Sequence, residues 1–252
     1  MPGGGRHTMI GPVWITGAGS GIGEALALAL GARGETVIAS GRRRRLLEAL
    51  AARQPGITPL PVDVTDGAAV EAAVAAMTPP PATAILCAGT HRPTPAGAFD
   101  AGQVRQLVEV NLMGIVHCVA ALLPVFRAAG GGHLVLVASV AGYRGLPTTA
   151  GYSASKAAVI ALAESLKLDL DGSGVRVTLV NPGFVDTPLT QRNDFPMPDM
   201  ITAAAAAQVI LRGLSGSAFE IAFPRRFALA MRLLRLLPSR LYFALVHKVT
   251  GL

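Results

Sequence analysis

Apolar residues form short continuous runs that alternate with longer segments of helical spacing. The short runs predict strands at Val13–Thr16, Thr36–Ser40, Thr58–Val62, Thr83–Ala88, His133–Ala138 and Val175–Val180. The longer segments predict helices at Glu24–Arg33, Leu46–Arg53, Gly67–Met77, Gln103–Arg127, Ser153–Leu170 and Ala203–Leu214. Continuous apolar strands are typical of a sheet covered on both faces, and helical crossovers imply parallel pairing. We therefore predict an α/β fold, a doubly wound parallel sheet in a single domain with helices on both faces.

A glycine-rich turn, TGAGSGIG over residues 16–23, joins the first predicted strand to the first predicted helix. Glycines let the backbone approach a diphosphate, and the helix start offers unpaired N–H groups and a partial positive charge. A lone glycine turn is weak evidence, but this position between strand and helix is the one that dinucleotide binding requires. We therefore predict a Rossmann-type domain whose cofactor contacts include Gly17, Ser20, Gly21, Ile22 and Gly23.

Tyr152 and Lys156 lie one turn apart on one face of a predicted helix. Hydride transfer at a carbonyl carbon needs a proton donor or acceptor on the oxygen, and a nearby ammonium makes a tyrosine better suited to that role. Such pairs arise often by chance, but this one follows Ser139 by thirteen residues. Ser139 ends a predicted central strand, where open sheets hold ligands and where its hydroxyl could stabilise charge on a substrate oxygen. Asn111, a polar residue in an apolar helix, is the fourth candidate.

These motifs together resemble the short-chain dehydrogenase/reductase family in its non-extended form of about 250 residues. Gly17, Gly21 and Gly23 match its cofactor signature, and the resemblance covers roughly residues 10 to 190. It implies an NAD(P)(H)-dependent oxidoreductase that interconverts a secondary alcohol and a ketone. It also implies the catalytic roles: acid/base for Tyr152, polarisation of the oxygen for Ser139, tuning of the phenol and binding of the nicotinamide ribose for Lys156, and holding a relay water for Asn111. The alternative is a non-catalytic redox sensor or scaffold, which a vacant catalytic position would favour.

The segment after the second predicted strand reads Ser40-Gly41-Arg42-Arg43 and has no acid to bond an adenosine ribose, which would select NAD. Arg42 could pair with a 2′-phosphate. Residues 42–45 could equally be a solvated helix start, although four positive charges there are unfavourable without an anion. Ser20 stands where many NADP-preferring relatives have a second basic residue. We expect NADP as cofactor, with NAD as the alternative.

The resemblance implies further cofactor contacts. Asp63 and Val64 would hold the adenine ring, although Asp63 could instead cap the next helix, a role for which Thr65 and Asp66 compete. The family has two asparagines before its Ala-Gly pair, and this chain has Leu86 and Cys87 there. The remaining implied contacts are Ala88, Gly89, Pro182, Gly183 and Thr187, the last of which would hold the nicotinamide carboxamide.

The segment from Pro188 to Met200 corresponds to a lid over the substrate in the family. Its apolar members Phe195, Met197 and Met200 suggest a hydrophobic substrate, but they could also pack on the core. Both interpretations, a lid over the substrate and packing on the core, remain open.

Composition narrows the choice of partners. The apolar fraction of 51% and mean hydropathy of +0.49 indicate a dense interior or an apolar surface given to a partner. Cys87 and Cys118 show neither metal-ligand nor disulfide spacing, which favours a reducing compartment. The net charge of +7 is concentrated in residues 42–45 and 225–240 without interleaved aromatics, so nucleic acid is not an expected partner. We expect a cytoplasmic protein with no spanning helix, because no apolar run of about 18 residues is uninterrupted.

We expect the chain to divide into a flexible tail at residues 1–9, a dinucleotide-binding and catalytic domain at residues 10–222 and a basic helical extension at residues 223–252. In the extension, one helix, Arg225–Leu237, has basic residues opposite apolar ones: Arg225, Arg232 and Arg235 against Phe227, Leu234 and Leu237. A second helix from Arg240 has an apolar face formed by Leu241, Tyr242, Leu245, Val246 and Val249. Such helices could cover the substrate pocket, join subunits of a homodimer or homotetramer, or lie on a membrane, which would make the protein membrane-associated.

Overall fold

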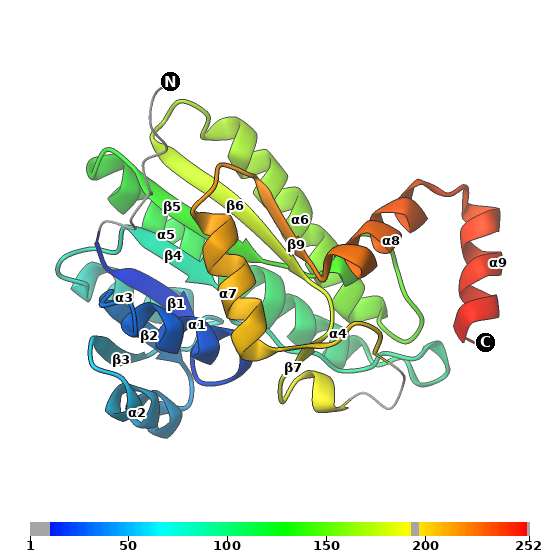
Figure 1. Ribbon diagram of the computed structural model, residues 1–252, viewed down its shortest axis with the longest axis horizontal. Helices are drawn as coiled ribbons and strands as arrows, with labels where there is room; N and C mark the ends of the chain where they lie inside the picture. Colours follow the sequence, from blue (N-terminus) through cyan, green and yellow to red (C-terminus); the bar gives the residue numbers. More distant parts are fainter. Residues whose placement is uncertain (1–10, 193–196, 251–252) are drawn as a thin grey trace.

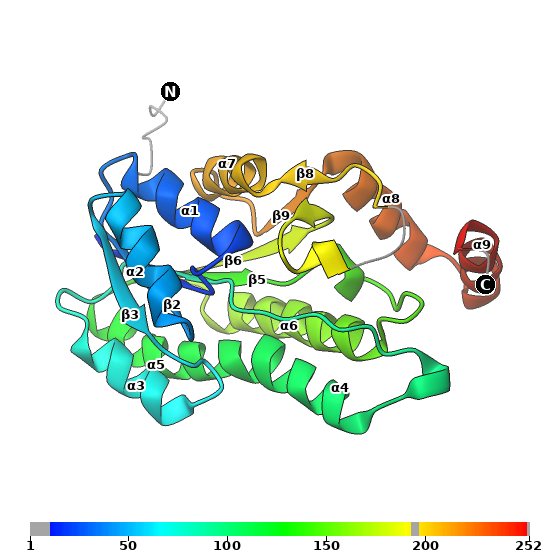
Figure 2. The ribbon, with the colours of Figure 1, turned by 90° about the horizontal axis from the view of Figure 1, so that it is seen from below.

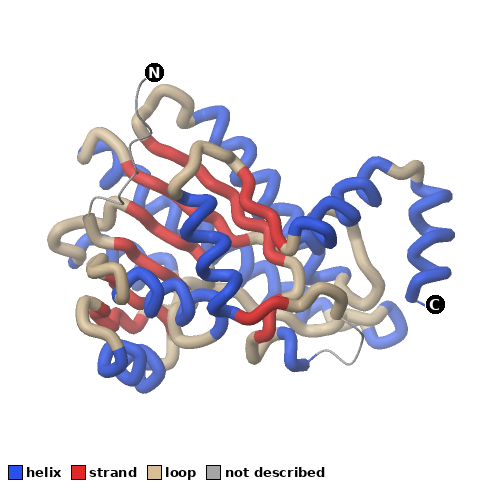
Figure 3. The backbone as a smooth tube through the Cα atoms, in the orientation of Figure 1, coloured by secondary structure: helices blue, strands red, loops and turns tan. Residues whose placement is uncertain are grey.

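Within residues 11–192 and 197–250, which the computed structural model describes, seven parallel strands form one sheet (Figures 1 and 3). Their order is β3-β2-β1-β4-β5-β6-β9. The strands are β1 (Val13–Thr16), β2 (Val37–Gly41), β3 (Ile57–Pro61), β4 (Thr83–Leu86), β5 (Gly132–Val137), β6 (Val175–Pro182) and β9 (Glu220–Phe223). The order reverses between β1 and β4, so a crevice is expected at their carboxyl ends. The predicted doubly wound parallel sheet is confirmed.

Helices cover both faces of the sheet (Figure 2). On one side lie α1 (Gly21–Gly31), α2 (Arg44–Arg53) and α7 (Ala203–Leu214). On the other side lie α3 (Gly67–Ala76), α4 (Ala101–Val108), α5 (Gly114–Ala128) and α6 (Ala150–Asp169). An apolar cluster lies on each side of the sheet. Within β1, Val13 and Ile15 belong to the cluster beneath α1, α2 and α7, and Trp14 belongs to the cluster on the other side. Side chains alternate between the two faces along a strand in this way.

Some boundaries differ from those predicted. α1 begins at Gly21 instead of Glu24, inside the glycine turn. The predicted helix 103–127 is divided by a π-helical turn, η2 (Glu109–Met113), between α4 and α5. The prediction missed β9, whose apolar run is only three residues long, and the parallel pair β7 (Val185–Asp186) with β8 (Ile201–Thr202), because strands of two residues carry no readable periodicity. Short 3₁₀ turns are η1 (Ala96–Ala98), η3 (Val140–Gly142) and η4 (Thr190–Arg192).

Two helices follow the sheet, α8 (Arg225–Leu236) and α9 (Ser239–Thr250). β9 reaches Phe223, one residue beyond the boundary expected at residue 222. α9 lies at the far end of the molecule from the sheet (Figures 1 and 2). The expected tail at residues 1–9 and Phe195 of the predicted lid lie outside the described residues.

Among the described residues, the continuous helical stretch Ala101–Ala128 is the one helix long and apolar enough to cross a membrane by length and composition. It comprises α4, η2 and α5. In the fold it packs against α3 and α6, and core helices of other proteins pass the same test.

Candidate active site

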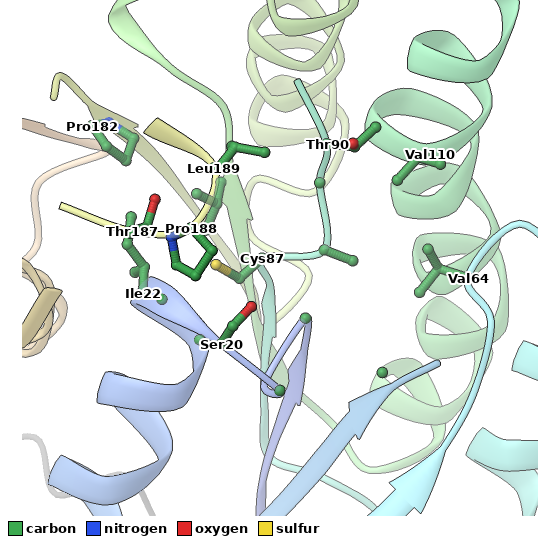
Figure 4. A pocket seen from close by; sticks show the side chains of 18 of the residues that line it. Ser20, Ile22, Val64, Cys87, Thr90, Val110, Pro182, Thr187, Pro188 and Leu189 are labelled. Carbon is green, nitrogen blue, oxygen red and sulfur yellow. The ribbon is translucent and has the colours of Figure 1, made fainter. Parts of the chain in front are cut away.

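A pocket opens along the carboxyl edge of the sheet, lined by the loops that follow β1 to β6. All the predicted cofactor-binding residues line it, as do Ser139, Tyr152 and Lys156. Asn111 is not itself a lining residue, but its Oδ1 lies beside the lining residue Gly89, and the neighbouring Val110 reaches the pocket (Figure 4). The topology therefore gathers residues spread over most of the chain into one site.

The glycine turn forms one end of the pocket, and its glycines are required for steric reasons. Gly17 and Gly21 have φ angles of +71° and +61°, which side chains rarely adopt. A Cβ at Gly23 would lie 2.4 Å from the Gly17 carbonyl oxygen. A Cβ at Gly21 would lie 3.0 Å from Cγ2 of Thr187, and Figure 4 shows Thr187 projecting toward this turn. The turn therefore presents bare backbone and the unpaired N–H groups of the α1 start to the pocket, a combination suited to a diphosphate.

Two arginines line the pocket where β2 passes into α2. Arg42 was predicted here, and Arg43 lies beside it. The Nη2 of Arg43 donates a hydrogen bond of 3.2 Å to Oγ of Ser20 in the glycine turn. A second basic residue thus reaches the turn from the next loop, which the spacing within the turn alone could not reveal.

Asp63 and Val64 line the pocket after β3. Asp66 is the residue that caps α3, because its side chain accepts from the Ala69 N–H. Asp63 accepts two bonds from Thr65, at 3.0 Å from N–H and 2.9 Å from the hydroxyl. The carboxylate of Asp63 is therefore held at the pocket wall by its own loop.

The α6 helix carries Tyr152 and Lys156 into the pocket. Nζ of Lys156 donates to the Val137 carbonyl at 3.0 Å and lies 5.9 Å from the centre of the Tyr152 ring. Ser139 follows β5, where its Oγ accepts from the Ala141 N–H and donates to the Pro182 carbonyl. These bonds hold the serine side chain between its own loop and the end of β6.

Burial dominates the electrostatics of this cluster. It raises the pKa of Tyr152, while a hydrogen bond with Ser139 lowers it. Burial lowers the pKa of Lys156 to about 8. At neutral pH the phenol is therefore protonated and Lys156 is still mainly an ammonium, so the pair holds one transferable proton beside one positive charge.

Asn111 ties three segments together from the π turn. Its Oδ1 accepts from the Thr90 N–H at 2.7 Å, and its Nδ2 donates to the Thr90 carbonyl and to Oγ of Ser155, both at 3.0 Å. The side chain is fully buried, so these bonds are well shielded from water. Asn111 thus holds the loop after β4 against α6, where its partner Ser155 immediately precedes Lys156. Single π turns of this kind occur frequently at functional sites.

Comparison with known proteins agrees with this geometry. The family profile described as short chain dehydrogenase matches residues 12–196. The chain belongs to the short-chain dehydrogenase family. An uncharacterised oxidoreductase of Myxococcus xanthus is 38% identical over 242 residues, 93% of this chain and 96% of its own length. A short-chain dehydrogenase of Burkholderia cenocepacia, solved with NADP, has a TM-score of 0.78 and 30% identity over 88% of this chain and 91% of its own. One from Burkholderia phymatum, solved with NAD, has a TM-score of 0.79 and 26% identity over 89% and 93%. The predicted family and the oxidoreductase class are confirmed.

Two pocket neighbours of this short-chain dehydrogenase escaped prediction. His91 is buried and packs edge-on against the Tyr152 ring with centres 4.7 Å apart. Cys87 lines the pocket, and burial raises its pKa to about 11 although the positive charge of Lys156 opposes this. The thiol is therefore neutral at physiological pH, and Cys87 fills space where the family has an amide side chain.

Proposed function

We propose that the chain interconverts a secondary alcohol and a ketone by hydride transfer and prefers NADP(H). The observation that carries the proposal is the convergence of Ser139, Tyr152 and Lys156 on the pocket that the glycine turn opens. Bare backbone, a helix start and two arginines at one end of that pocket fit a dinucleotide with an extra phosphate. The bound nicotinamide would supply or accept the hydride.

In the reductive direction the chain's own residues handle the proton. The Ser139 hydroxyl turns from the Pro182 carbonyl, donates its one hydrogen bond to the substrate carbonyl oxygen and stabilises the negative charge that develops there. The protonated phenol of Tyr152 gives its proton to that oxygen, completing the alcohol as hydride reaches the carbon. The Lys156 ammonium stabilises the phenolate that remains. In the oxidative direction the phenolate takes the alcohol proton, and the same two neighbours favour its charged form.

The preference for NADP(H) rests on Arg42 and Arg43 at the pocket and on the lack of an acid in the segment 40–43. Guanidinium groups pair well with phosphate. Similar proteins use both cofactors, since the Burkholderia cenocepacia structure was solved with NADP and the Burkholderia phymatum structure with NAD. A hydrophobic substrate is supported by the apolar residues Pro188 and Leu189 at the pocket wall.

The reaction can be tested with two tyrosine variants. Tyr152→Phe should lower NADPH-dependent reduction across a panel of ketones by about 10²- to 10⁴-fold, the usual contribution of a general acid. Tyr143→Phe is the matched control, because the Tyr143 hydroxyl lies outside the pocket and donates to Glu220. Near-normal turnover by Tyr143→Phe and loss in Tyr152→Phe support the proposal. Equal, slow oxidation of NADPH by both variants and the wild type would refute it.

That refuting result would favour the second function, a dinucleotide-binding redox sensor or scaffold. Such a protein needs the glycine turn and the arginines but has no need for a titrating phenol. NADPH binding by an otherwise inactive wild type would identify it.

A further inference from the structure

The two C-terminal helices expose an unusual amount of apolar surface. Of the eleven large apolar side chains exposed in the described part of the chain, seven lie on α8 and α9. They are Leu229, Leu233, Leu236, Leu241, Phe243, Leu245 and Val249. The other four are scattered singly over the domain, as is normal for a protein surface. A cluster of this size marks a binding surface.

The exposed residues form strips on helix faces that the fold has not used. On α8, Leu229, Leu233 and Leu236 have helical i, i+4, i+7 spacing, while Ala228 and Met231 on the inner face are buried. On α9, Leu241, Leu245 and Val249 have i, i+4, i+8 spacing, while Tyr242 is buried. α8 is thus apolar on two sides, one of which packs on the protein, whereas on α9 the exposed side chains share one apolar face with the buried Tyr242.

Arg144 and Tyr242 hold the extension in place. Nη1 of Arg144 donates to the carbonyls of Leu234 and Leu237 at 2.8 and 2.6 Å, where α8 ends. The guanidinium lies 3.9 Å from the centre of the Tyr242 ring, and the Tyr242 hydroxyl donates to the Gly145 carbonyl. The exposed strips therefore have a defined position on the molecule, although α9 lies well away from the sheet (Figures 1 and 3).

Charge selects the partner for this surface. Residues 224–250 contain six Arg or Lys and no Asp or Glu: Arg225, Arg226, Arg232, Arg235, Arg240 and Lys248. Arg232 pairs with Glu220, and within residues 11–192 and 197–250 the other five form no salt bridge. Packing the same surface of a second copy against it would bring like charges together. An anionic lipid surface complements both the arginines and the apolar strips.

We propose that α8 and α9 bind an anionic lipid bilayer. The leucine strips enter the boundary between headgroups and acyl chains, and the basic side chains lie at the level of the lipid phosphates.

The position of the extension connects this surface to the pocket. β9 runs parallel to β6, so α8 leaves the sheet at the carboxyl edge on which the pocket opens. Near the start of α8, Phe227 packs on Phe184 with ring centres 5.2 Å apart, next to the pocket residue Gly183. Bilayer binding would therefore hold the pocket at the membrane surface, where lipophilic alcohols and ketones concentrate. This consequence rests on the proposed function, whereas lipid binding does not.

Vesicle sedimentation tests the proposal with the full chain. The wild type should bind vesicles of phosphatidylcholine with phosphatidylglycerol more strongly than phosphatidylcholine alone, and added salt should weaken binding. Leu236→Gln/Leu241→Gln should bind about tenfold or more weakly, because two apolar side chains no longer enter the lipid. Leu168→Gln is the matched control, since Leu168 on α6 is exposed to the same 78% as Leu236. Arg235→Gln/Arg240→Gln should lose about fivefold per arginine on the anionic vesicles.

The result does not depend on turnover. Lipid binding by an inactive wild type would leave this proposal intact and refute only the proposed function. Absence of binding to anionic vesicles, or equal binding by Leu236→Gln/Leu241→Gln and Leu168→Gln, would overturn the proposal. So would a leucine variant that binds lipid normally but loses self-association in sedimentation equilibrium, since the strips would then join two copies. The arginine variant keeps all the apolar contacts and provides an independent test if the leucine variant folds poorly.

Discussion

Replacing Gly23 with alanine should weaken dinucleotide binding much more than replacing Gly19 in the same turn. A Cβ at Gly23 would lie 2.4 Å from the Gly17 carbonyl oxygen and 2.8 Å from its carbonyl carbon, far inside the separation of about 3.5 Å that such atoms prefer. Both contacts are backbone, so the turn itself must move. Overpacking of this kind costs about 1–3 kcal/mol. In the free protein the turn can shift to relieve this clash, but a bound diphosphate needs the original turn. The energy of restoring that turn should therefore raise the Kd of the dinucleotide about 5- to 150-fold.

Gly19→Ala is the matched control. Its Cβ would lie 3.6 Å from Cβ of Leu46, an ordinary contact, so the Kd should stay within about twofold of the wild type. Fluorescence titration with NADPH measures both values, and thermal unfolding checks that each variant is folded. Wild-type affinity in folded Gly23→Ala would show that the cofactor does not require this turn geometry. Equal losses in both variants would show that any added methyl blocks the turn, and the steric reasoning would fail.

Three further outcomes are expected. Lys156→Met should abolish turnover yet raise the free energy of unfolding at pH 7 in urea titrations, because burial lowers the Lys156 pKa to about 8 and thus opposes its charge; a less stable variant would contradict this. Burial lowers the His133 pKa from 6.5 to about 3, so the unfolded chain binds the extra proton between these values and stability should fall with falling pH, by up to about 1.4 kcal/mol per unit. His133→Gln should flatten that slope, and an unchanged slope would exclude His133 as its source. Arg43→Ala should raise the Kd for NADPH about tenfold or more and leave that for NADH nearly unchanged; equal effects would remove Arg43 from any 2′-phosphate site.

The sheet could be predicted from the sequence because its strands are buried on both faces. After His133, for example, residues 134–138 are all apolar, so both faces of the strand carry apolar side chains. Its length and apolar content were therefore enough to find β5. β9 was missed because its four residues begin with the charged Glu220 and leave an apolar run of only three, no longer than those in many loops. The π turn was also missed. It lies where Asn111 bonds Thr90 and Ser155, partners that are distant in the chain and could not be inferred from helical spacing.

The same distinction applies to the predicted site. The Tyr152–Lys156 pair and the glycine turn are each local motifs that spacing reveals, and their positions after predicted strands, together with the family resemblance, suggested that they meet in one site. Arg43 reaches Ser20 only because β2 lies beside β1 in the sheet, and His91 meets Tyr152 from another loop. In the extension, the spacing identified Phe227 and Leu234 as an apolar face, and both pack on the core. The second, exposed strip on α8 was not recognised, because an amphipathic pattern was expected to have a single apolar side.

The loop after β5 joins the proposed catalytic residues to the extension. Ser139 stands at its start in the pocket. Gly142 follows, and a Cβ there would lie 2.7 Å from the Lys156 carbonyl carbon, so the loop can press against α6 only with glycine at this position. Arg144 and Gly145 come next and hold the end of α8 and the Tyr242 hydroxyl. The contacts that hold α9 are therefore made by residues within six positions of Ser139 in the chain. If the extension binds lipid, the loop that holds the membrane-binding helices in place also carries Ser139, the proposed catalytic serine.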